Sequence, residues 1–246
     1  MADRREQTRI RDEYRRREQE IPEERYAPWN PAEIFLLQDR RRRAAQLLHA
    51  AGRFPTVESR CLEIGFGRGG WLPELIAWGA CEPNLYGVEL EPGRAFTTAR
   101  RLPAARLAIA DGGRLPWRSG RFDLVVLSLV LTSVLDNGLR QRIAAEAERV
   151  LAPGGAVLWY DFAVDNPRNP QVRAVGRLEL RELFPTLVGK VHSASLAPPL
   201  ARRLAPRSRW LAELLGSLPF LQTHLLAVLT KPHPSDLCLQ RPQGSL

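Results

Sequence analysis

The stretch that decides the fold reads Leu62-Glu63-Ile64-Gly65-Phe66-Gly67-Arg68-Gly69-Gly70. It follows an apolar run at residues 61–64, which predicts a strand, and it precedes residues 71–78, whose apolar spacing predicts a helix. Glycines at such a junction let the backbone turn tightly and let a ligand approach where a Cβ would collide. The stretch therefore predicts a ligand-binding turn at the carboxyl end of a strand.

The chain after this turn alternates short apolar runs with helical patterns. Further strands are predicted at residues 85–90, 107–110, 122–128 and 156–162, with helices at residues 95–102 and 139–151. Alternation of this kind predicts an α/β fold, with a Rossmann-like, doubly wound and mostly parallel sheet that helices cover on both faces. Beyond residue 162 the rhythm loosens, and two more strands are predicted at residues 187–193 and 224–230.

Two carboxylates end the strands that follow the glycine turn. Glu89 ends the second strand, where it can accept hydrogen bonds from both hydroxyls of a ribose. Asp111 ends the third strand next to Gly112 and can accept a hydrogen bond from the amino group of an adenine. Both lie where open α/β sheets bind their ligands.

Two classes of cofactor compete for such a site. A dinucleotide brings a pyrophosphate, which favours helix N-terminal amides and no nearby negative charge. S-adenosylmethionine brings an ammonium, a carboxylate and a sulfonium instead. Arg68 suits a pyrophosphate or the methionine carboxylate equally, whereas Glu63 would repel a pyrophosphate and complement an ammonium. The balance favours S-adenosylmethionine.

With these residues the sequence resembles the class I S-adenosylmethionine-dependent methyltransferases. Five motifs in order carry the resemblance over about residues 58–162, namely the stretch from Glu63 to Gly70, Gly87-Val88-Glu89-Leu90, the run from Ala110 to Trp117, the run from Phe122 to Ser128, and the turn Pro153-Gly154-Gly155. The resemblance implies a seven-stranded sheet whose last strand, at residues 224–230, is antiparallel.

The resemblance also implies a set of cofactor-binding residues and a division of the chain. The set comprises Glu63, Gly65, Phe66, Gly67, Arg68, Gly69, Glu89, Leu90, Asp111, Gly112 and Ser128. Residues 1–55 are expected to form an N-terminal helical arm, residues 56–231 the methyltransferase domain, and residues 232–246 a flexible tail.

The catalytic residues are less well marked than the cofactor site. A sulfonium methyl is already activated, so transfer is an in-line displacement that needs alignment and exclusion of water. An oxygen or nitrogen acceptor must also lose a proton, and Asp161, at the end of the fifth strand, is the candidate base. Tyr14 and Tyr26 are candidates for closing over the cofactor, and His192 is interpreted as structural.

Charge gives the main indication about the acceptor. The 246 residues carry a net charge of +9, and residues 166–209 contain nine basic residues against two acidic ones. A local +7 favours an anionic partner. We expect a small-molecule or glycan-like acceptor, methylated at oxygen, as in compact bacterial methyltransferases of biosynthetic clusters. RNA methylation is an alternative, although neither an appended RNA-binding module nor a basic–aromatic stripe is evident. A non-catalytic relative and a nicotinamide-dependent oxidoreductase are further alternatives.

The remaining composition excludes several classes. The three cysteines are widely spaced and form no CxxC pair, which argues against a disulfide framework or a zinc site, so no metal is expected. No apolar run resembles a secretory signal, and the longest apolar stretch is too short and too interrupted to span a bilayer. We therefore expect a cytoplasmic protein with no transmembrane segment.

Overall fold

The structure, a computed structural model, describes residues 2–68, 70–167, 169–233 and 235. The α-helices are α1 (Ala2–Glu20), α2 (Pro31–Ala50), α3 (Leu72–Ala77), α4 (Pro92–Arg101), α5 (Asn137–Val150), α6 (Arg177–Leu183), α7 (Pro198–Leu204) and α8 (Arg209–Gly216). The strands are β1 (Cys61–Ile64), β2 (Leu85–Glu89), β3 (Arg106–Ile109), β4 (Phe122–Ser128), β5 (Leu151–Phe162), β6 (Val191–Leu196) and β7 (Gln222–Thr230). Short 3-10 helices include η1 (Glu23–Tyr26) and η3 (Leu131–Ser133).

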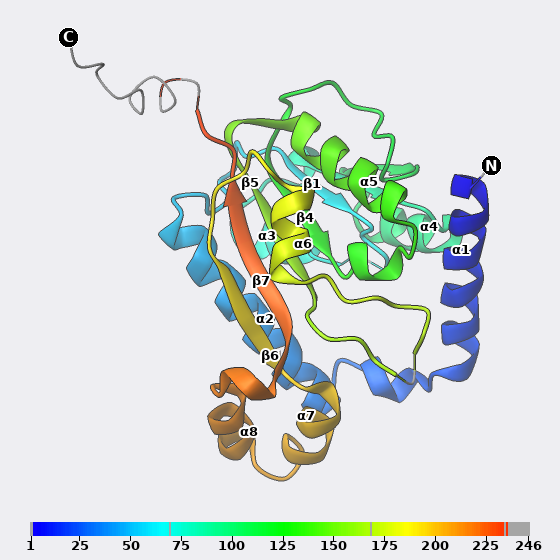
Figure 1. Cartoon of the computed structure of the whole chain (residues 1–246), viewed down its shortest axis with the longest axis vertical. Coiled ribbons are helices and arrows are strands. Elements are labelled where there is room, and N and C mark those ends of the chain that lie inside the picture. Colours follow the sequence, from blue (N-terminus) through cyan, green and yellow to red (C-terminus); the bar gives the residue numbers. More distant parts are fainter. Residues whose placement is uncertain (1, 69, 168, 234, 236–246) are drawn as a thin grey trace.

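The seven strands form one sheet in the order β3-β2-β1-β4-β5-β7-β6. The five strands from β3 to β5 pair in parallel, and β7 runs antiparallel to both β5 and β6. This topology confirms the predicted Rossmann-like sheet and its antiparallel last strand. Figure 1 shows β7 and β6 at the edge of the sheet far from α1.

One strand was placed wrongly from the sequence. The run predicted at residues 187–193 pairs as a strand only from Val191 onward, and β6 continues to Leu196. Val188 forms an isolated bridge with Thr230 instead, because the backbone at Gly189 lies directly against the Val228 carbonyl, where a Cβ would come within 2.2 Å. The apolar pair at residues 187–188 thus lies outside the continuous ladder.

Helices cover both faces of the sheet, and the strand period of two divides the core between them. In β4, Val125 and Leu127 face the cluster that contains α5, whereas Leu124 and Val126 face the cluster that contains α3 and the end of α2. Strands buried on both faces explain why the sequence runs are continuously apolar rather than alternating.

The N-terminal segment forms two helices that take different positions. Helix α1 lies beside the carboxyl ends of β1 and β2 and buries Ile10 in the α5-side core. Helix α2 begins after Asn30, whose side chain accepts hydrogen bonds from the amides of Ala32 and Glu33. It packs against β6, β7 and α7 (Figure 1).

The structure bears on the predicted C-terminal tail and on the predicted absence of a transmembrane segment only for the residues that it describes. The predicted tail at residues 232–246 lies mostly outside the described residues. Within the described ranges no helix combines the length and apolar character that crossing a bilayer requires.

Candidate functional site

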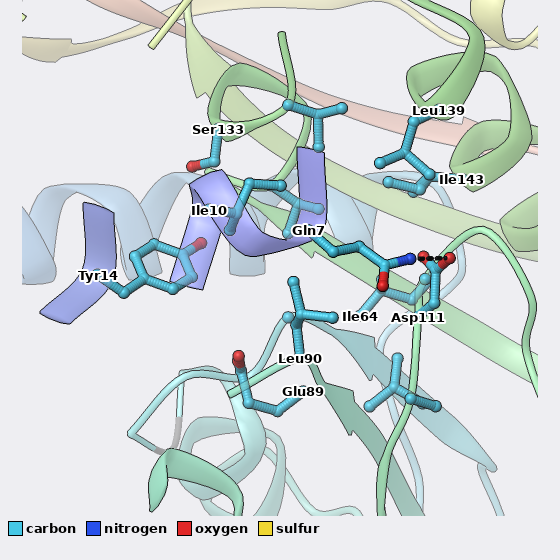
Figure 2. Close-up of a pocket in the computed structure, with 16 residues that line it drawn as sticks. Gln7, Ile10, Tyr14, Ile64, Glu89, Leu90, Asp111, Ser133, Leu139 and Ile143 are labelled. Atoms are coloured by element: carbon cyan, nitrogen blue, oxygen red, sulfur yellow. Dashed lines mark hydrogen bonds between the residues drawn. The ribbon is translucent and has the colours of Figure 1, made fainter. Parts of the chain in front are cut away.

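The carboxyl ends of β1, β2 and β3 and the segment after β4 enclose a cavity beneath α1 (Figure 2). Its volume is about 60 Å³. Its lining comprises Gln7, Ile10, Tyr14, Ile64, Gly65, Val88, Glu89, Leu90, Ala110, Asp111, Gly112, Val130, Ser133, Val134, Leu139 and Ile143. Of the predicted cofactor-binding set, the lining contains Gly65, Glu89, Leu90, Asp111 and Gly112, and it also contains Tyr14, which was predicted to close over the cofactor.

The glycine turn contributes Gly65 to the cavity lining and has a positive φ at Gly65 and at Gly67. Gly65 has a φ of +73°, and a Cβ there would lie 2.8 Å from Cγ2 of Val130. Gly67 has a φ of +56°, and its amide donates a hydrogen bond to Oε2 of Glu89 over 2.8 Å. A side chain at Gly65 would therefore strain the backbone and push against the opposite wall.

Glu89 is held rigidly at the end of β2. One carboxylate oxygen accepts from the amide of Gly67 and the other from the amide of Glu91, over 2.8 and 2.9 Å. The side chain is 3% exposed. A carboxylate oxygen can accept more than one hydrogen bond, so Glu89 retains capacity for ribose hydroxyls.

Asp111 contacts both its own turn and α1. Its Oδ1 accepts from the amide of Gly113, and its Oδ2 accepts from Nε2 of Gln7, both over 2.8 Å (Figure 2). The amide of Gln7 thus donates to Asp111 the kind of hydrogen bond that the sequence predicted from an adenine amino group.

Glu63 is directed away from the cavity, contrary to its predicted role beside an ammonium group. Its carboxylate accepts hydrogen bonds from the amides of Trp71 and Leu72, over 2.8 to 3.1 Å, at the start of α3. Burial raises the pKa of Glu63 to about 8. A Cβ at Gly70 would lie 2.0 Å from Oε1 of Glu63. The carboxyl group of Glu63 therefore packs directly against the backbone of the glycine turn.

The other members of the predicted set lie around the turn but do not line the cavity. Phe66 is buried in the α3-side core, against Gly87. The side chain of Arg68 is exposed and lies 3.3 Å from Glu18 of α1. Ser128 is half-buried at the end of β4. Gly69 lies outside the described residues.

Asp161, the candidate base, is completely buried beneath the site. Its Oδ1 accepts hydrogen bonds from the hydroxyl and amide of Thr132, over 2.6 and 3.4 Å, and its Oδ2 accepts from Nε1 of Trp159 over 3.0 Å. Burial raises the pKa of Asp161 to about 7. Because both oxygens are used by protein donors, the geometry does not support the predicted role as a base. It makes Asp161 an anchor for η3.

Helix α1 closes the cavity by contacts to both of its rims. On one rim, Glu6 accepts from the amide of Leu135, and Arg9 donates to the carbonyl of Ser133, both over 2.6 Å. On the other rim, Arg11 donates to the carbonyl of Leu90 over 3.2 Å, and Glu18 pairs with Arg94 over 2.9 Å.

The two tyrosines predicted to close the site behave differently. Tyr14 lines the cavity beneath the guanidinium of Arg94, which lies 4.0 Å from its ring centroid. Burial raises the pKa of Tyr14, and the charge of Glu89 adds to this. Tyr26 is 48% exposed and does not line the cavity. His192, interpreted as structural, is exposed on β6.

Sequence reasoning missed Gln7 and Ile10. The available signal was the spacing of Ile10 and Tyr14, which are four residues apart and share one face of an otherwise polar helix. A single apolar pair is too little to predict which surface it covers.

The hydrogen-bond acceptors and the apolar walls of the cavity fit the adenosine part of S-adenosylmethionine. Two carboxylates converge with a glycine turn, between apolar walls formed by Ile64, Val88 and Ile143. Helix α1 takes up part of this space, because Gln7 and Ile10 line it and Gln7 already donates to Oδ2 of Asp111. An adenine amino group can therefore replace Gln7 at this oxygen only if that part of α1 moves. Within the described residues, no group of three or more metal-ligating side chains occurs.

Comparison with known proteins agrees with this site. Residues 62–159 match the family described as methyltransferase domain. The glycine/sarcosine/dimethylglycine N-methyltransferase of Actinopolyspora halophila is 33% identical over 133 residues, which are 51% of this chain and 23% of that protein. The sterol 4-C-methyltransferase strm-1 of Caenorhabditis elegans is 29% identical over 127 residues, which are 48% of this chain and 36% of that protein.

These relatives are much longer than the region they share with this chain, which spans about a third or less of their length. Among solved structures, the N-methyltransferase NodS of Bradyrhizobium japonicum WM9 superposes with a TM-score of 0.58 at 20% identity, covering 80% of this chain and 98% of that one. At that identity the superposition establishes the fold.

Proposed function

We propose that this chain, which carries a methyltransferase domain of the class I, S-adenosylmethionine-dependent type, transfers a methyl group to a small-molecule acceptor. The observation that carries the proposal is the convergence of Glu89 and Asp111 with Gly65 of the glycine turn in one apolar-walled cavity. The relatives named as sterol and glycine/sarcosine methyltransferases support a small acceptor.

The residues of the cavity have distinct roles in this proposal. Glu89 accepts hydrogen bonds from the ribose hydroxyls, and Asp111 accepts from the adenine amino group once Gln7 has released it. S-adenosylmethionine, when bound, supplies an activated methyl group. Helix α1, which contacts both rims, excludes water from the site, and exclusion of water favours transfer over side reactions.

The arrangement favours catalysis by alignment over catalysis by a dedicated base. Asp161 is sequestered by Thr132 and Trp159, and its role as a base would require it to leave both partners. Methylation of oxygen on a glycan-like metabolite stays a prediction from the sequence. The names of the two relatives specify carbon and nitrogen, so all three acceptor atoms belong in a screen.

RNA methylation through the basic 166–209 region is less well supported. Several of its arginines are engaged within the chain, because Arg173 pairs with Glu179 over 2.7 Å and Arg209 with Glu213 over 2.9 Å. A nicotinamide cofactor is also disfavoured, since no basic side chain lines the cavity among the described residues.

Calorimetric titration tests the proposal. The full chain is titrated with S-adenosylmethionine, S-adenosylhomocysteine and NAD, and the titration is repeated on Asp111→Ala. Asp12→Ala is the matched control, since Asp12 lies on the exposed side of α1 with its side chain 63% exposed. Micromolar binding of both sulfur ligands, lost in Asp111→Ala and retained in Asp12→Ala, supports the cofactor site and leads to a screen with labelled methyl. Binding of NAD alone would overturn the proposal.

A further inference from the structure

On the sheet face opposite α5, Arg40 of α2 lies against two aromatic rings. Its Cζ is 4.8 Å from the ring centroid of Trp71 and 5.5 Å from that of Tyr160, near the carboxyl end of β5. A guanidinium over aromatic faces is electrostatically favourable. Burial lowers the pKa of Arg40, but arginine stays protonated at neutral pH. The chain therefore keeps a positive charge between these rings.

Two hydrogen-bond donors in this cluster have no acceptor. Nε of Arg40 and Nε1 of Trp71 are both buried and make no hydrogen bond in the described part of the chain. Trp71 is 1% exposed. Buried donors are nearly always paired in native proteins, because leaving one unpaired costs its full desolvation. Two adjacent unpaired donors, one of them cationic, indicate a missing acceptor.

Among the described residues no side chain makes a hydrogen bond with either donor, although Glu33 and Glu63 lie close enough to interact with Arg40 electrostatically. Glu63 is occupied by the amides of Trp71 and Leu72, and no ion pair involving Arg40 occurs among the described residues. The hydroxyl of Tyr160 donates to Ser195 over 2.9 Å and makes no hydrogen bond with Nε of Arg40. His224 stacks on Tyr160 at 4.8 Å, and its Nδ1 lies 3.2 Å from the hydroxyl of Thr223.

The cluster lies next to the cavity beneath α1. Trp71 directly follows Gly70 of the glycine turn. After β4, Leu129 adopts a φ of +59° and donates its amide to the carbonyl of Tyr160 over 2.8 Å. Leu129 packs on the Trp71 and Tyr160 side, whereas Val130 lines the cavity. Residues 129–130 thus form the partition between the Arg40 cluster and the cofactor cavity.

We infer that Nε of Arg40 and Nε1 of Trp71 bind an oxygen of a carboxylate or phosphate group on the methyl acceptor. This inference rests on the proposed methyl transfer. A cationic donor next to a neutral donor suits an oxyanion, whose hydrogen bonds are stronger than those of a neutral acceptor. The flanking rings exclude water and so strengthen the interaction. The acceptor is then an anionic small molecule, held on the α2 side of the partition.

The experiment follows the indole N–H of Trp71 in the full chain labelled with ¹⁵N-tryptophan. Trp71→Phe assigns the resonance. The probes are acetate and inorganic phosphate, each compared with sodium chloride at the same ionic strength. Arg40→Met removes the cationic donor. Arg42→Met is the matched control, since it lies on the same helix, removes the same charge and has a side chain 63% exposed.

Acetate or phosphate should shift the Trp71 resonance saturably, and the tighter ion identifies the group that the acceptor carries. Arg40→Met should weaken that binding by about tenfold or more, and Arg42→Met should leave it unchanged. If Arg40→Met does not fold, Arg40→Lys, which keeps the charge but loses Nε, should also bind more weakly. A resonance that responds to neither ion beyond the effect of chloride would overturn the inference.

Binding of S-adenosylhomocysteine, measured on the same samples, separates the two proposals. An ion-dependent shift without binding of S-adenosylhomocysteine would refute methyl transfer and, with it, the assignment of the ion to an acceptor. Binding of S-adenosylhomocysteine without an ion-dependent shift would refute only the Arg40 site.

Discussion

Gln7 donates a hydrogen bond from Nε2 to Oδ2 of Asp111 over 2.8 Å, across 104 residues of sequence. The same carboxylate is the one expected to receive the adenine amino group. Helix α1 is therefore a competitor of the cofactor at this atom as well as the cover of the cavity. Because Gln7, Ile10 and Tyr14 of α1 also line the cavity, we expect cofactor binding to be coupled to movement of α1.

Gln7→Ala tests this competition. The substitution removes one hydrogen bond between α1 and the site, worth about 0.5–1.5 kcal/mol, and so makes opening easier. Calorimetry should show S-adenosylhomocysteine binding about two- to tenfold more tightly. Thr8→Ala, on the exposed side of α1, should leave affinity unchanged. Weaker binding in Gln7→Ala would mean that Gln7 contacts the cofactor itself.

The glycine turn gives a prediction with an internal control. Gly65→Ala and Gly52→Ala both place a side chain at a positive φ, +73° and +64°, where the strain is about 1–2 kcal/mol. Only at Gly65 would the new Cβ also meet Val130, at 2.8 Å. Both variants should lose thermal stability, but only Gly65→Ala should lose affinity for S-adenosylhomocysteine. Equal affinities of Gly65→Ala and Gly52→Ala for S-adenosylhomocysteine would show that the side chain of Val130 moves to make room for the new methyl group.

The sheet was predictable from the sequence because most of its strands contain a short, largely apolar run between turn residues. The register of β6 was not, since Leu187 and Val188 have the composition of a strand but are followed by the close backbone contact at Gly189. Local composition does not report such a tertiary contact. The predicted boundary of this strand was therefore wrong, while its existence was confirmed.

The candidate site was predictable where a residue's role follows from its strand position. Glu89 and Asp111 line the cavity because each comes at or just after the end of a parallel strand. The position of a residue in a strand does not predict which way its side chain points. Glu63 and Asp161 point into buried hydrogen bonds with protein groups rather than into the cavity. Gln7 was unpredictable, because only the docking of α1 brings it to Asp111.

Glu63 predicts a pH dependence of stability. Its pKa rises from an ordinary value near 4.5 to about 8 in the folded chain because the group is buried. The folded state therefore holds a proton that the unfolded state loses, and this contribution to stability is present below about pH 4.5 and is lost as the pH rises towards 8.

Glu63→Gln should remove this dependence. The free energy of unfolding of the variant, relative to that of the unmodified chain, should grow by about 1 kcal/mol per pH unit between pH 5 and 8 and then level off. Denaturant titrations at several pH values measure it, and taking the difference cancels groups common to both proteins. A difference that does not change with pH would show that Glu63 is ionised in the folded state.

Asp161→Asn separates a base from an anchor. An asparagine can still accept from Trp159 and donate to the hydroxyl oxygen of Thr132, and it gives up only the 3.4 Å hydrogen bond from the Thr132 amide. We therefore expect η3 to stay in place and binding of S-adenosylhomocysteine not to change. With an acceptor found in the labelled-methyl screen, kcat should fall less than about tenfold, because alignment of acceptor and methyl does not depend on a proton at Asp161. Loss of a general base would instead lower kcat by about 10²–10⁴ and remove a limb of its pH profile. Thr132→Val deletes the hydroxyl that Asp161 holds but leaves the carboxylate in place. It should therefore lower kcat only through displacement of η3, without removing a limb of the pH profile.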